Sequence, residues 1–381
     1  AADALLCAAL ALAWDPQRAP YAPHTLVDQA VEAAKRDRAT AGQSGFLNAC
    51  LRRFLRERDA LVAATEADPV AVWNHPAWWI GRLQNDHPVH WQAVLRAGNA
   101  APPLTLRANR LRTTPEALVQ RLAEAGLPAR RCGKDGLVLE TPRPVQAIPG
   151  FEAGEWSVQD AAAQLAAPLL LEGLSAPADG RPLRVLDACA APGGKTAHLL
   201  EALGSASPPV PAEVIALDVD PVRCQRIDET LARLGLSASV RAADAARPAD
   251  WWDGRPFDAI LLDAPCSGSG IVRRHPDARW LRRESDIPAL ARTQDRLLAA
   301  LWPLLAPGGR LVYCTCSVFR EEGQARIESF VAHNTDAVLQ PAPGHLLPPD
   351  PENGLPVPEN RLGDHDGFFY ARLHKRPAPL K

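Results

Sequence analysis

Two short segments of the chain carry cysteines that could act as nucleophiles. One runs from Asp263 to Gly268 and contains Cys266, and the other is Tyr313-Cys314-Thr315-Cys316-Ser317. A single cysteine on a strand usually fills core space, whereas two cysteines flanked by Pro, Ser and Gly favour a reactive site. The thiolate is the nucleophilic form of cysteine, so these segments predict covalent catalysis. Zinc binding is the rival use of clustered thiols, but no Cys-x2-Cys pair or nearby His pair completes four ligands, and we expect no metal.

A third segment, Asp187 to Thr196, could bind a nucleotide-type cofactor. Its small residues and two glycines let the backbone approach a ligand, and the helix that follows presents N-terminal amides to a carboxylate or phosphate. A phosphate-binding P-loop is disfavoured, because Cys189 stands where that motif requires Gly. A merely structural strand-to-helix turn is the other alternative. The candidate cofactor-binding residues here are Cys189, Ala190, Ala191, Pro192, Gly193, Gly194 and Lys195.

Aspartates follow the apolar runs of this half of the chain. Asp218 ends one run, at the place where a carboxylate accepts hydrogen bonds from the ribose hydroxyls of a cofactor. Asp220 is a neighbouring candidate, although it fits better as the N-cap of a helix that begins at Pro221. Asp244 follows the next strand and could reach an adenine amino group, but taken alone it is no better than a loop aspartate. Asp263 completes the candidate set.

The elements that must position these residues form a regular alternation. Short continuous apolar runs at residues 185–187, 214–218, 259–263 and 311–313 alternate with helical segments such as 221–234 and 287–305. Such runs indicate strands buried on both faces, and therefore an α/β fold with a doubly wound, mostly parallel sheet. Ligands bind at the carboxyl ends of such strands. We therefore expect Asp263, Cys266 and Cys316 to line one crevice, with the Gly-rich segment on its other side.

The rest of the chain predicts two further parts. Residues 1–64 form a helical segment, residues 65–160 form linker helices and a small α+β domain, and residues 161–381 form the sheet domain. Within these parts we expect a helical stretch from Trp78 to Gly98, strands at 104–107, 137–139 and 156–158, a helix at 115–125, an irregular Pro-rich loop at 341–358 and a closing strand at 367–373.

Composition limits the classes of protein. Apolar residues make up 47% and charged residues 23% of the 381 residues, which excludes a largely disordered chain. The apolar run from Ala4 to Trp14 is about half of the roughly 20 residues that span a bilayer, and no basic region of a signal peptide precedes it. We expect a buried helix there and no membrane partner. Eight scattered cysteines are typical of the cytoplasm. Because the chain contains no Met, we expect that an N-terminal segment is missing.

A nucleic-acid partner would need a local basic patch, because the formal net charge is only -2. The candidates are Arg273, Arg274, Arg279, Arg282 and Arg283, interleaved with His275 and Trp280. Guanidinium groups pair with phosphates and stack on bases. The alternative is a solvated helix face that is balanced by Asp277, Glu284 and Asp286.

Together the motifs resemble a known family. Asp-Ala-Cys-Ala-Ala-Pro-Gly-Gly-Lys-Thr, Asp-Ala-Pro-Cys-Ser, and Thr-Cys-Ser after Leu-Val-Tyr are similar to the Sun/NOL-type RNA cytosine-5 methyltransferases, which have a Rossmann-like class I methyltransferase fold. The segment from Arg273 to Trp280, the Pro-Ala-Trp-Trp region and the helical N-terminus resemble the bacterial members that act on 16S ribosomal RNA. The resemblance covers nearly the whole chain. In one departure, the chain begins inside the family's N-terminal RNA-binding domain, which is similar to the antitermination factor NusB.

The resemblance implies S-adenosyl-L-methionine as cofactor and 16S ribosomal RNA as substrate, at cytosine 967 in the standard rRNA numbering. Carbon 5 of cytosine becomes nucleophilic only after a thiolate adds to carbon 6. By resemblance Cys316 is that nucleophile, and Cys266 assists proton removal and product release. Asp263 could hold the cytosine edge, and Lys195 could lower the thiol pKa or orient the base. Cys314 competes for the first role, since it faces the same side of its strand as Cys316.

Two other functions remain open at this point. A methyltransferase of another class could act on DNA, protein or a small molecule, and an enzyme of the DNA cytosine type would use Cys266 as nucleophile. A catalytically inactive RNA-binding or assembly factor could keep the same fold. The oligomeric state is not encoded in any motif, and we expect a monomer.

Overall fold

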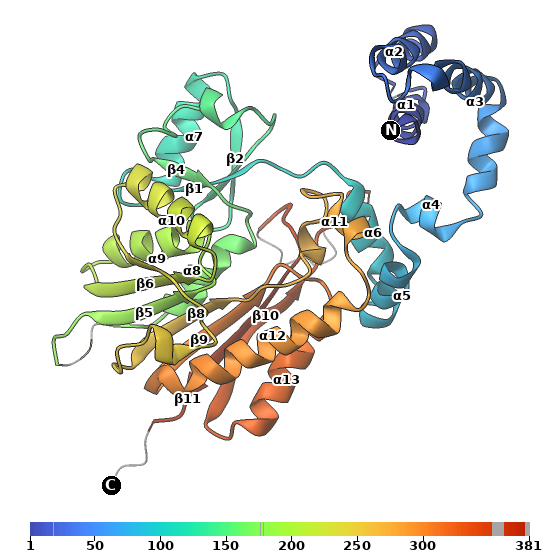
Figure 1. The fold of residues 1–381 in the computed structure, drawn as a ribbon. Helices are drawn as coiled ribbons and strands as arrows, with labels where there is room; N and C mark the ends of the chain where they lie inside the picture. The colour runs from blue at the N-terminus through green and yellow to red at the C-terminus, as the bar shows by residue number, and fades with distance from the viewer. Residues whose placement is uncertain (18, 176, 178, 353–361, 378–381) are drawn as a thin grey trace. The chain divides into compact units, whose positions relative to one another are not determined.

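The computed structural model describes residues 1–381 except 18, 176, 178, 353–361 and 378–381 (Figure 1). It divides into two compact units, Ala1–Asn74 and His75–Lys381. The predicted domain boundaries near residues 64 and 160 stay predictions. Among the described residues, no helix combines the length and the apolar character needed to cross a membrane.

The first unit is helical, as its apolar spacing predicts. Leu26, Ala30 and Leu51 are buried where its longer helices meet. Residues three and four positions apart share one helix face, so each helix buries one stripe and leaves the rest in water. The helices of this unit are α1 (Ala2–Ala13), α2 (Pro23–Arg36), α3 (Ser44–Thr65) and α4 (Pro69–Trp73).

The second unit begins with two helices, where the sequence predicts one stretch. These are α5 (Ala77–Asp86) and α6 (Trp91–Asn99). His87 leaves the helical conformation, with φ −137° and ψ 64°, directly before Pro88. Proline restricts the residue before it to extended conformations, which explains the break.

A small antiparallel sheet follows, with strand order β2-β3-β1-β4. Leu118 and Leu122 of its helix pack on Leu106, Leu137 and Trp156 of the strands. The predicted strands are present, and β2 is an addition: three of its four residues are partly or fully exposed, so no apolar alternation marks it. The elements are β1 (Thr105–Ala108), α7 (Pro115–Glu124), β2 (Ala129–Cys132), β3 (Gly136–Leu139) and β4 (Trp156–Val158).

A buried ion pair fastens this small sheet to the next layer. Arg107 of β1 donates to Glu201 over 2.8 Å and to the Gly194 carbonyl over 2.9 Å, and both Arg107 and Glu201 are almost fully buried. A buried guanidinium needs such partners, because desolvation of an unpaired charge is very costly. The small sheet is therefore held against the helix that carries Gly194.

The large sheet has seven strands in the order β10-β11-β9-β8-β5-β6-β7. The five strands β9, β8, β5, β6 and β7 run parallel, and β11 and β10 are antiparallel at one edge. This confirms the predicted mostly parallel α/β fold. The strands are β5 (Leu183–Ala188), β6 (Ala212–Asp218), β7 (Ser239–Ala242), β8 (Phe257–Asp263), β9 (Leu305–Thr315), β10 (Ala337–Leu346) and β11 (Phe368–Lys375).

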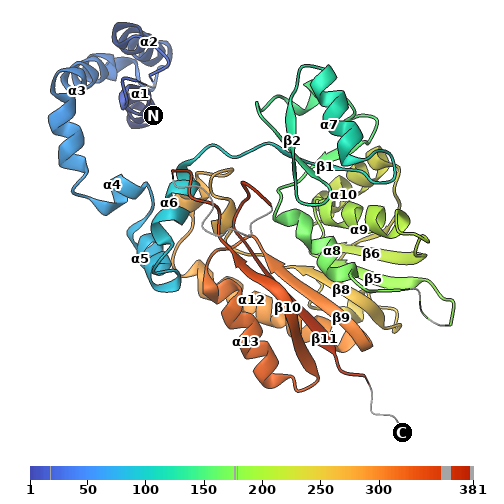
Figure 2. The ribbon, with the colours of Figure 1, turned by 180° about the vertical axis from the view of Figure 1, so that it is seen from behind.

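Helices cover both faces of this sheet (Figures 1 and 2). On one face α8, α9 and α10 pack on residues such as Val185 and Ala216, and on the other α12 and α13 pack on residues such as Leu186 and Ile260. Both faces are therefore apolar, as the continuous runs predict. The helices are α8 (Ala166–Leu171), α9 (Gly194–Gly204), α10 (Pro221–Leu234), α11 (Ala278–Leu281), α12 (Asp286–Leu301) and α13 (Gln324–His333).

Two predictions in this region were wrong in part. The predicted loop at 341–358 begins inside β10, whose pairing with β11 shifts register between Gln340 and Gly344. Proline is tolerated there because β10 is an edge strand with an irregularity; residues 353–358 lie outside the described residues. The predicted helix 287–305 is α-helical only to Leu301, continues as a short 3-10 helix at Trp302–Leu304, and gives way to β9 at Leu305, because Pro303 has no backbone N–H for an α-helical hydrogen bond.

Candidate active site

The carboxyl ends of β5, β6, β8 and β9 lie side by side, and the predicted segments follow them. After β5 the chain turns sharply: Cys189 has φ +62°, and Gly193 has φ +96° directly before α9. A Cβ on Gly193 would lie 3.1 Å from Cα of Ile227 in α10. Glycine is required there by both the backbone angle and the close packing. The turn from Cys189 to Gly193 thus brings backbone close to the sheet edge.

Asp218 fastens this turn from the neighbouring strand. Its buried carboxylate accepts a hydrogen bond from the Ala191 backbone N–H over 3.1 Å and from the Asp220 N–H over 3.2 Å. An Arg223 guanidinium nitrogen lies 3.5 Å from the same carboxylate. Asp220 itself accepts from the N–H of Val222 over 2.8 Å, so it caps α10 as the sequence predicts. Of the two aspartates, Asp218 therefore remains the candidate ligand at the end of β6.

Asp218 and Asp244 line one small cavity, which we term the acidic cavity. Its volume is about 170 Å³, and Cys189 and Arg223 also lie in its wall. Asp244 follows β7 and accepts from the Ala246 N–H over 2.9 Å, which holds its loop. The acidic cavity is lined by Cys189, Leu217, Asp218, Val219, Arg223, Ala243, Asp244, Ala245, Pro265, Thr293, Arg296 and Leu297.

A larger cavity of about 560 Å³, the thiol cavity, opens beside it. Asp263, Cys266 and Cys316 lie in its wall, and so do Ala191 and Pro192 of the first turn. The two cavities share Cys189, Arg223 and Pro265 as lining residues. The predicted cofactor residues and the predicted thiols therefore meet at one place, with a wall common to both.

Lys195 and Asp263 form an ion pair below the thiol cavity. Nζ of Lys195 lies 2.7 Å from Oδ2 of Asp263, and the ammonium also lies 5.7 Å from the ring centre of Phe368. Burial opposes the charge on Lys195, but the Asp263 carboxylate outweighs it and raises the pKa of the lysine. Cys314 is fully buried and donates its thiol to the other carboxylate oxygen of Asp263 over 3.4 Å. Asp263 is thus held in place by two neighbours, one at each carboxylate oxygen.

Cys266 and Cys316 are in direct contact, with their Sγ atoms 3.4 Å apart. Both thiols are half-buried, whereas Cys314 is fully buried. The contact with Cys316, burial and the nearby Glu322 carboxylate together raise the pKa of Cys266 well above its ordinary value. Cys266 therefore keeps its proton at neutral pH. The pair can hold one thiol as donor and one sulfur as acceptor.

The predicted basic patch is wrong for three of its five arginines. Arg273 is buried and pairs with Asp364 over 2.7 Å and with Asp366 over 2.6 Å, and Arg274 pairs with Asp366 and Asp160. Arg279 is also buried and donates to Asn99 and to the Gly98 carbonyl. Arg282 donates to the Ser267 carbonyl over 3.0 Å, and Arg283 is exposed. Most of the run ties segments together, because its cations find carboxylates from distant parts of the chain.

Sequence reasoning missed two residues of the site. Arg223 lines both cavities, and its place three residues after the helix cap Asp220 could have marked it. Glu322 lies buried beneath both cysteine segments. It had no local signal, because a Glu-Glu pair before a helix is usually exposed. Among the described residues, no cluster of three or more His, Cys, Asp or Glu side chains could hold a metal ion.

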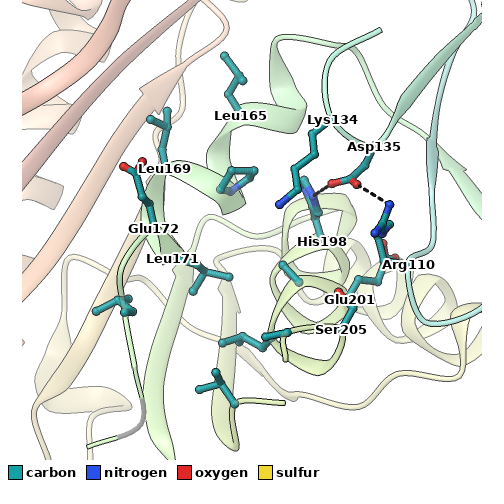
Figure 3. A pocket seen from close by; sticks show the side chains of 16 residues that line it. Arg110, Lys134, Asp135, Leu165, Leu169, Leu171, Glu172, His198, Glu201 and Ser205 are labelled. Atoms are coloured by element: carbon teal, nitrogen blue, oxygen red, sulfur yellow. Dashed lines mark ion pairs between the residues drawn. The ribbon is translucent and has the colours of Figure 1, made fainter. Parts of the chain in front are cut away.

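A further cavity of about 500 Å³ lies between the small sheet and α8 and α9 (Figure 3). Asp135 stands there between Arg110 and His198, at 3.7 and 3.8 Å. Burial and the Arg107 cation lower the pKa of His198 to about 4. The cavity contains none of the sequence-predicted site residues, and its buried Glu201 is already paired with Arg107.

Comparisons with known proteins identify relatives of this chain. The family described as 16S rRNA methyltransferase RsmB/F matches residues 175–374, and the ferredoxin-like domain of RsmF/B-like methyltransferases matches residues 75–146. The ribosomal RNA small subunit methyltransferase B of Salmonella arizonae is 42% identical over 364 residues, which are 93% of this chain and 78% of that protein. The protein of the same name from Pseudomonas putida is 46% identical over 341 residues, 88% of this chain and 74% of its own.

A solved structure shows the same arrangement. The methyltransferase homologue from Pyrococcus horikoshii is 27% identical, with a TM-score of 0.64, and the match covers 80% of this chain and 97% of that one. The expected resemblance to bacterial RNA methyltransferases is confirmed by these matches. The chain belongs to the 16S rRNA methyltransferase RsmB/F family.

Proposed function

We propose that this protein transfers a methyl group from S-adenosyl-L-methionine to carbon 5 of a cytosine in 16S ribosomal RNA. The observation that carries the proposal is the contact of Cys266 and Cys316 in a cavity that shares its wall with the acidic cavity. Methylation of small-subunit ribosomal RNA is what the names of its relatives describe. Cytosine 967 is the finer expectation, and it rests on the resemblance alone.

The acidic cavity fits the adenosine part of the cofactor. Asp218 stands at the end of β6, where a carboxylate accepts from ribose hydroxyls, and Asp244 could accept from the adenine amino group. The turn from Cys189 to Gly193 and the first amides of α9 would face the methionine part. When bound, S-adenosyl-L-methionine supplies an electrophilic methyl group on sulfonium sulfur. Arg223, in the common wall, would lie between the two ligands.

Cys316 is the nucleophile in this proposal. Its thiolate forms a bond to carbon 6 of cytosine, and the ring electrons move to carbon 5, which then accepts the methyl group. Loss of the carbon-5 proton restores the double bond and breaks the bond between Cys316 and carbon 6. Cys314 is the weaker candidate, because it is fully buried and its thiol is engaged by Asp263.

Cys266 assists the release step. It lies in contact with the sulfur that must leave, and it holds a proton at neutral pH. It can thus give its proton to the departing Cys316 sulfur and, as the thiolate so formed, accept the carbon-5 proton. In the alternative, Cys266 attacks the base as in DNA cytosine enzymes. Cys266 would then be the nucleophile, and Cys316 would assist the release.

Asp263 and Lys195 act as a pair on the base. Asp263 can hold the cytosine edge near its ring nitrogen, and Lys195 keeps Asp263 oriented through the 2.7 Å contact. Lys195 contacts the carboxylate, so we infer that it positions Asp263. The target base must leave any stack to reach this pair, because the thiols lie in a cavity below the surface.

Mass spectrometry of nucleosides tests the function. The protein is incubated with 16S ribosomal RNA transcript, or with small subunits, and with methyl-labelled S-adenosyl-L-methionine. We expect label in 5-methylcytidine, and none with a Cys316→Ala variant. Label in another nucleoside would show that the protein catalyses a different methylation reaction. Binding of RNA without any label, on transcript and on subunits, would favour an inactive assembly factor.

A further inference from the structure

A buried carboxylate that the proposed mechanism does not use lies beneath both cysteine segments. Glu322 is fully buried, in the turn that follows the second cysteine segment. Its Oε1 accepts the Ser267 backbone N–H over 2.7 Å, and its Oε2 accepts the Ser267 hydroxyl. The Ser317 hydroxyl donates to the same Oε2 over 2.7 Å. Ser267 and Ser317 are the residues directly after Cys266 and Cys316.

Neighbouring groups complete this network. The hydroxyl oxygens of Ser269 and Ser317 lie 2.8 Å apart, and Ser269 accepts the Val318 N–H over 2.9 Å. Ser317 accepts the Phe319 N–H over 3.1 Å, and Ser267 accepts the Ser269 N–H over 3.2 Å. When the single proton of the Ser317 hydroxyl goes to Glu322, the Ser269 hydroxyl is the donor between the two serines.

Gln294 supplies the fourth donor. Its amide lies 3.4 Å from Oε1 of Glu322 and also donates to the Pro265 carbonyl over 2.9 Å. Burial raises the pKa of Glu322, and the hydrogen bonds from Ser267, Ser317 and Gln294 oppose that rise. A carboxylate offers about four acceptor positions, and donors of these three residues occupy them. In the described residues, Glu322 forms no ion pair. A buried charge without a cation is an expensive way to add stability, which points to a geometric role.

We propose that Glu322 is a positioning residue that sets the spacing of the thiols of Cys266 and Cys316. The Cys266 segment follows β8 and the Cys316 segment follows β9, and backbone hydrogen bonds join the two segments from the Ala264 N–H to the Cys314 carbonyl and from the Gly270 N–H to the Cys316 carbonyl, both over 2.9 Å. Between these two bonds, the side chains of Ser267 and Ser317 share Glu322 as acceptor. The carboxylate bridges them. The effect of this spacing on methyl transfer rests on the proposed function. The effect of Glu322 on the spacing itself does not depend on that function.

Glutamine in place of Glu322 has nearly the same shape but cannot accept at both ends. Its amide nitrogen would meet the hydroxyls of Ser267 and Ser317, which already accept the N–H groups of Ser269 and Phe319. One donor would then face another, so the positions of Ser267 and Ser317, and with them the spacing of the two thiols, would change. A displacement of about 1 Å can lower a rate by about 10²-fold.

The rate at which Cys266 and Cys316 are oxidised to a disulfide, here called closure, reports the spacing of the two thiols in the absence of RNA. Diamide accepts two protons and two electrons from Cys266 and Cys316 and is reduced to the hydrazine, while one S–S bond forms between them. The rate is followed by mass spectrometry of the crosslinked peptides, with fragmentation to assign Cys316. We expect closure to be about tenfold slower in Glu322→Gln than in the wild type. Glu321→Gln is the matched control, since that neighbour is partly exposed and pairs with Arg82.

Formation of an adduct with RNA that carries 5-fluorocytosine measures the consequence. We expect Glu322→Gln to lose about 10²-fold in the adduct rate, with unchanged affinity for S-adenosyl-L-methionine. Equal closure rates in variant and wild type would overturn the proposal, and so would a wild type that forms no Cys266–Cys316 crosslink. Loss of cofactor binding together with closure would also overturn it, since Glu322 would then hold the whole site. If the wild type forms no adduct with the RNA, the proposed function is wrong. The rate of disulfide formation then still tests whether Glu322 positions the two thiols.

Discussion

The Sγ atom of Cys266 lies 3.4 Å from that of Cys316, although 50 residues separate them. The contact follows from the sheet: β8 and β9 are parallel neighbours, and Asp263 pairs in register with Cys314. Residues just beyond the two strand ends must therefore meet. Contact with Cys316 and burial raise the pKa of Cys266, so Cys266 can serve as the proton donor of the pair.

The roles predict opposite behaviour of two variants. With RNA that carries 5-fluorocytosine, Cys316→Ala should form no covalent complex, because no thiolate reaches carbon 6. Cys266→Ala should accumulate an RNA-linked species and lose about 10²- to 10⁴-fold in turnover, the usual contribution of a proton-transfer group. Denaturing gels measure the complex. Cys7→Ala, at an exposed cysteine of α1, is the control. An adduct that survives in Cys316→Ala would move the nucleophile to Cys266.

The acidic cavity predicts a defect that is confined to the cofactor. Asp244→Asn and Asp218→Asn should each raise the dissociation constant for S-adenosyl-L-methionine about tenfold, because a hydrogen bond to a charged group contributes about 1.5–3 kcal/mol. Isothermal titration calorimetry measures this. Asp220→Ala is the control: it removes the cap of α10, which costs about 1 kcal/mol of stability, and should leave the affinity unchanged. Unaltered binding by Asp244→Asn would exclude that residue from the cofactor site.

The position of the site could be predicted from the sequence because few topologies are compatible with it. Apolar runs that end in Asp218 and Asp263 indicate parallel strands, and parallel strands present their carboxyl ends at one edge. The loop lengths then require Cys266 and Cys316 to approach each other. Local patterns suffice where, as in this sheet, parallel strands alternate with the helices that cover them.

The rest depended on partners far away in the chain. The sequence predicts a surface patch at Arg273 and Arg274, because no residue near them in the chain indicates their ion-pair partners. These partners are Asp364, Asp366 and Asp160, which are distant in the sequence. Glu322 is buried only because serines from two segments donate to it. Long-range pairing of charges leaves no periodicity in a sequence, so these residues could not be assigned before the fold was known.

Buried His198 predicts a loss of stability in acid. Burial and the Arg107 cation lower its pKa from 6.5 to about 4 in the folded protein. Above pH 6.5 the imidazole is neutral in both states and contributes nothing. Between pH 6.5 and about 4 only the unfolded chain binds the proton, so stability falls as pH falls, by on the order of 3 kcal/mol in all. Chemical denaturation from pH 7 to 4 measures this. In His198→Gln the free energy of unfolding should depend less on pH over that range. An equally steep pH dependence in the variant would show that His198 is not the group responsible.

The ion pairs of Arg273 predict that this residue maintains the fold without contacting RNA. Arg273→Ala should lower the free energy of unfolding by about 3 kcal/mol, because Asp366 is fully buried and would keep only Arg274 as partner. Urea denaturation measures that loss. In the folded variant the dependence of RNA affinity on salt should match the wild type, since no phosphate contact is removed. Arg283→Ala is the matched comparison, because that side chain is exposed: its stability should change by less than about 0.5 kcal/mol, and its salt slope should fall by about one if Arg283 meets a phosphate. A reduced slope in Arg273→Ala would restore the surface patch that the sequence suggests and would require the Asp366 pair to open on RNA binding.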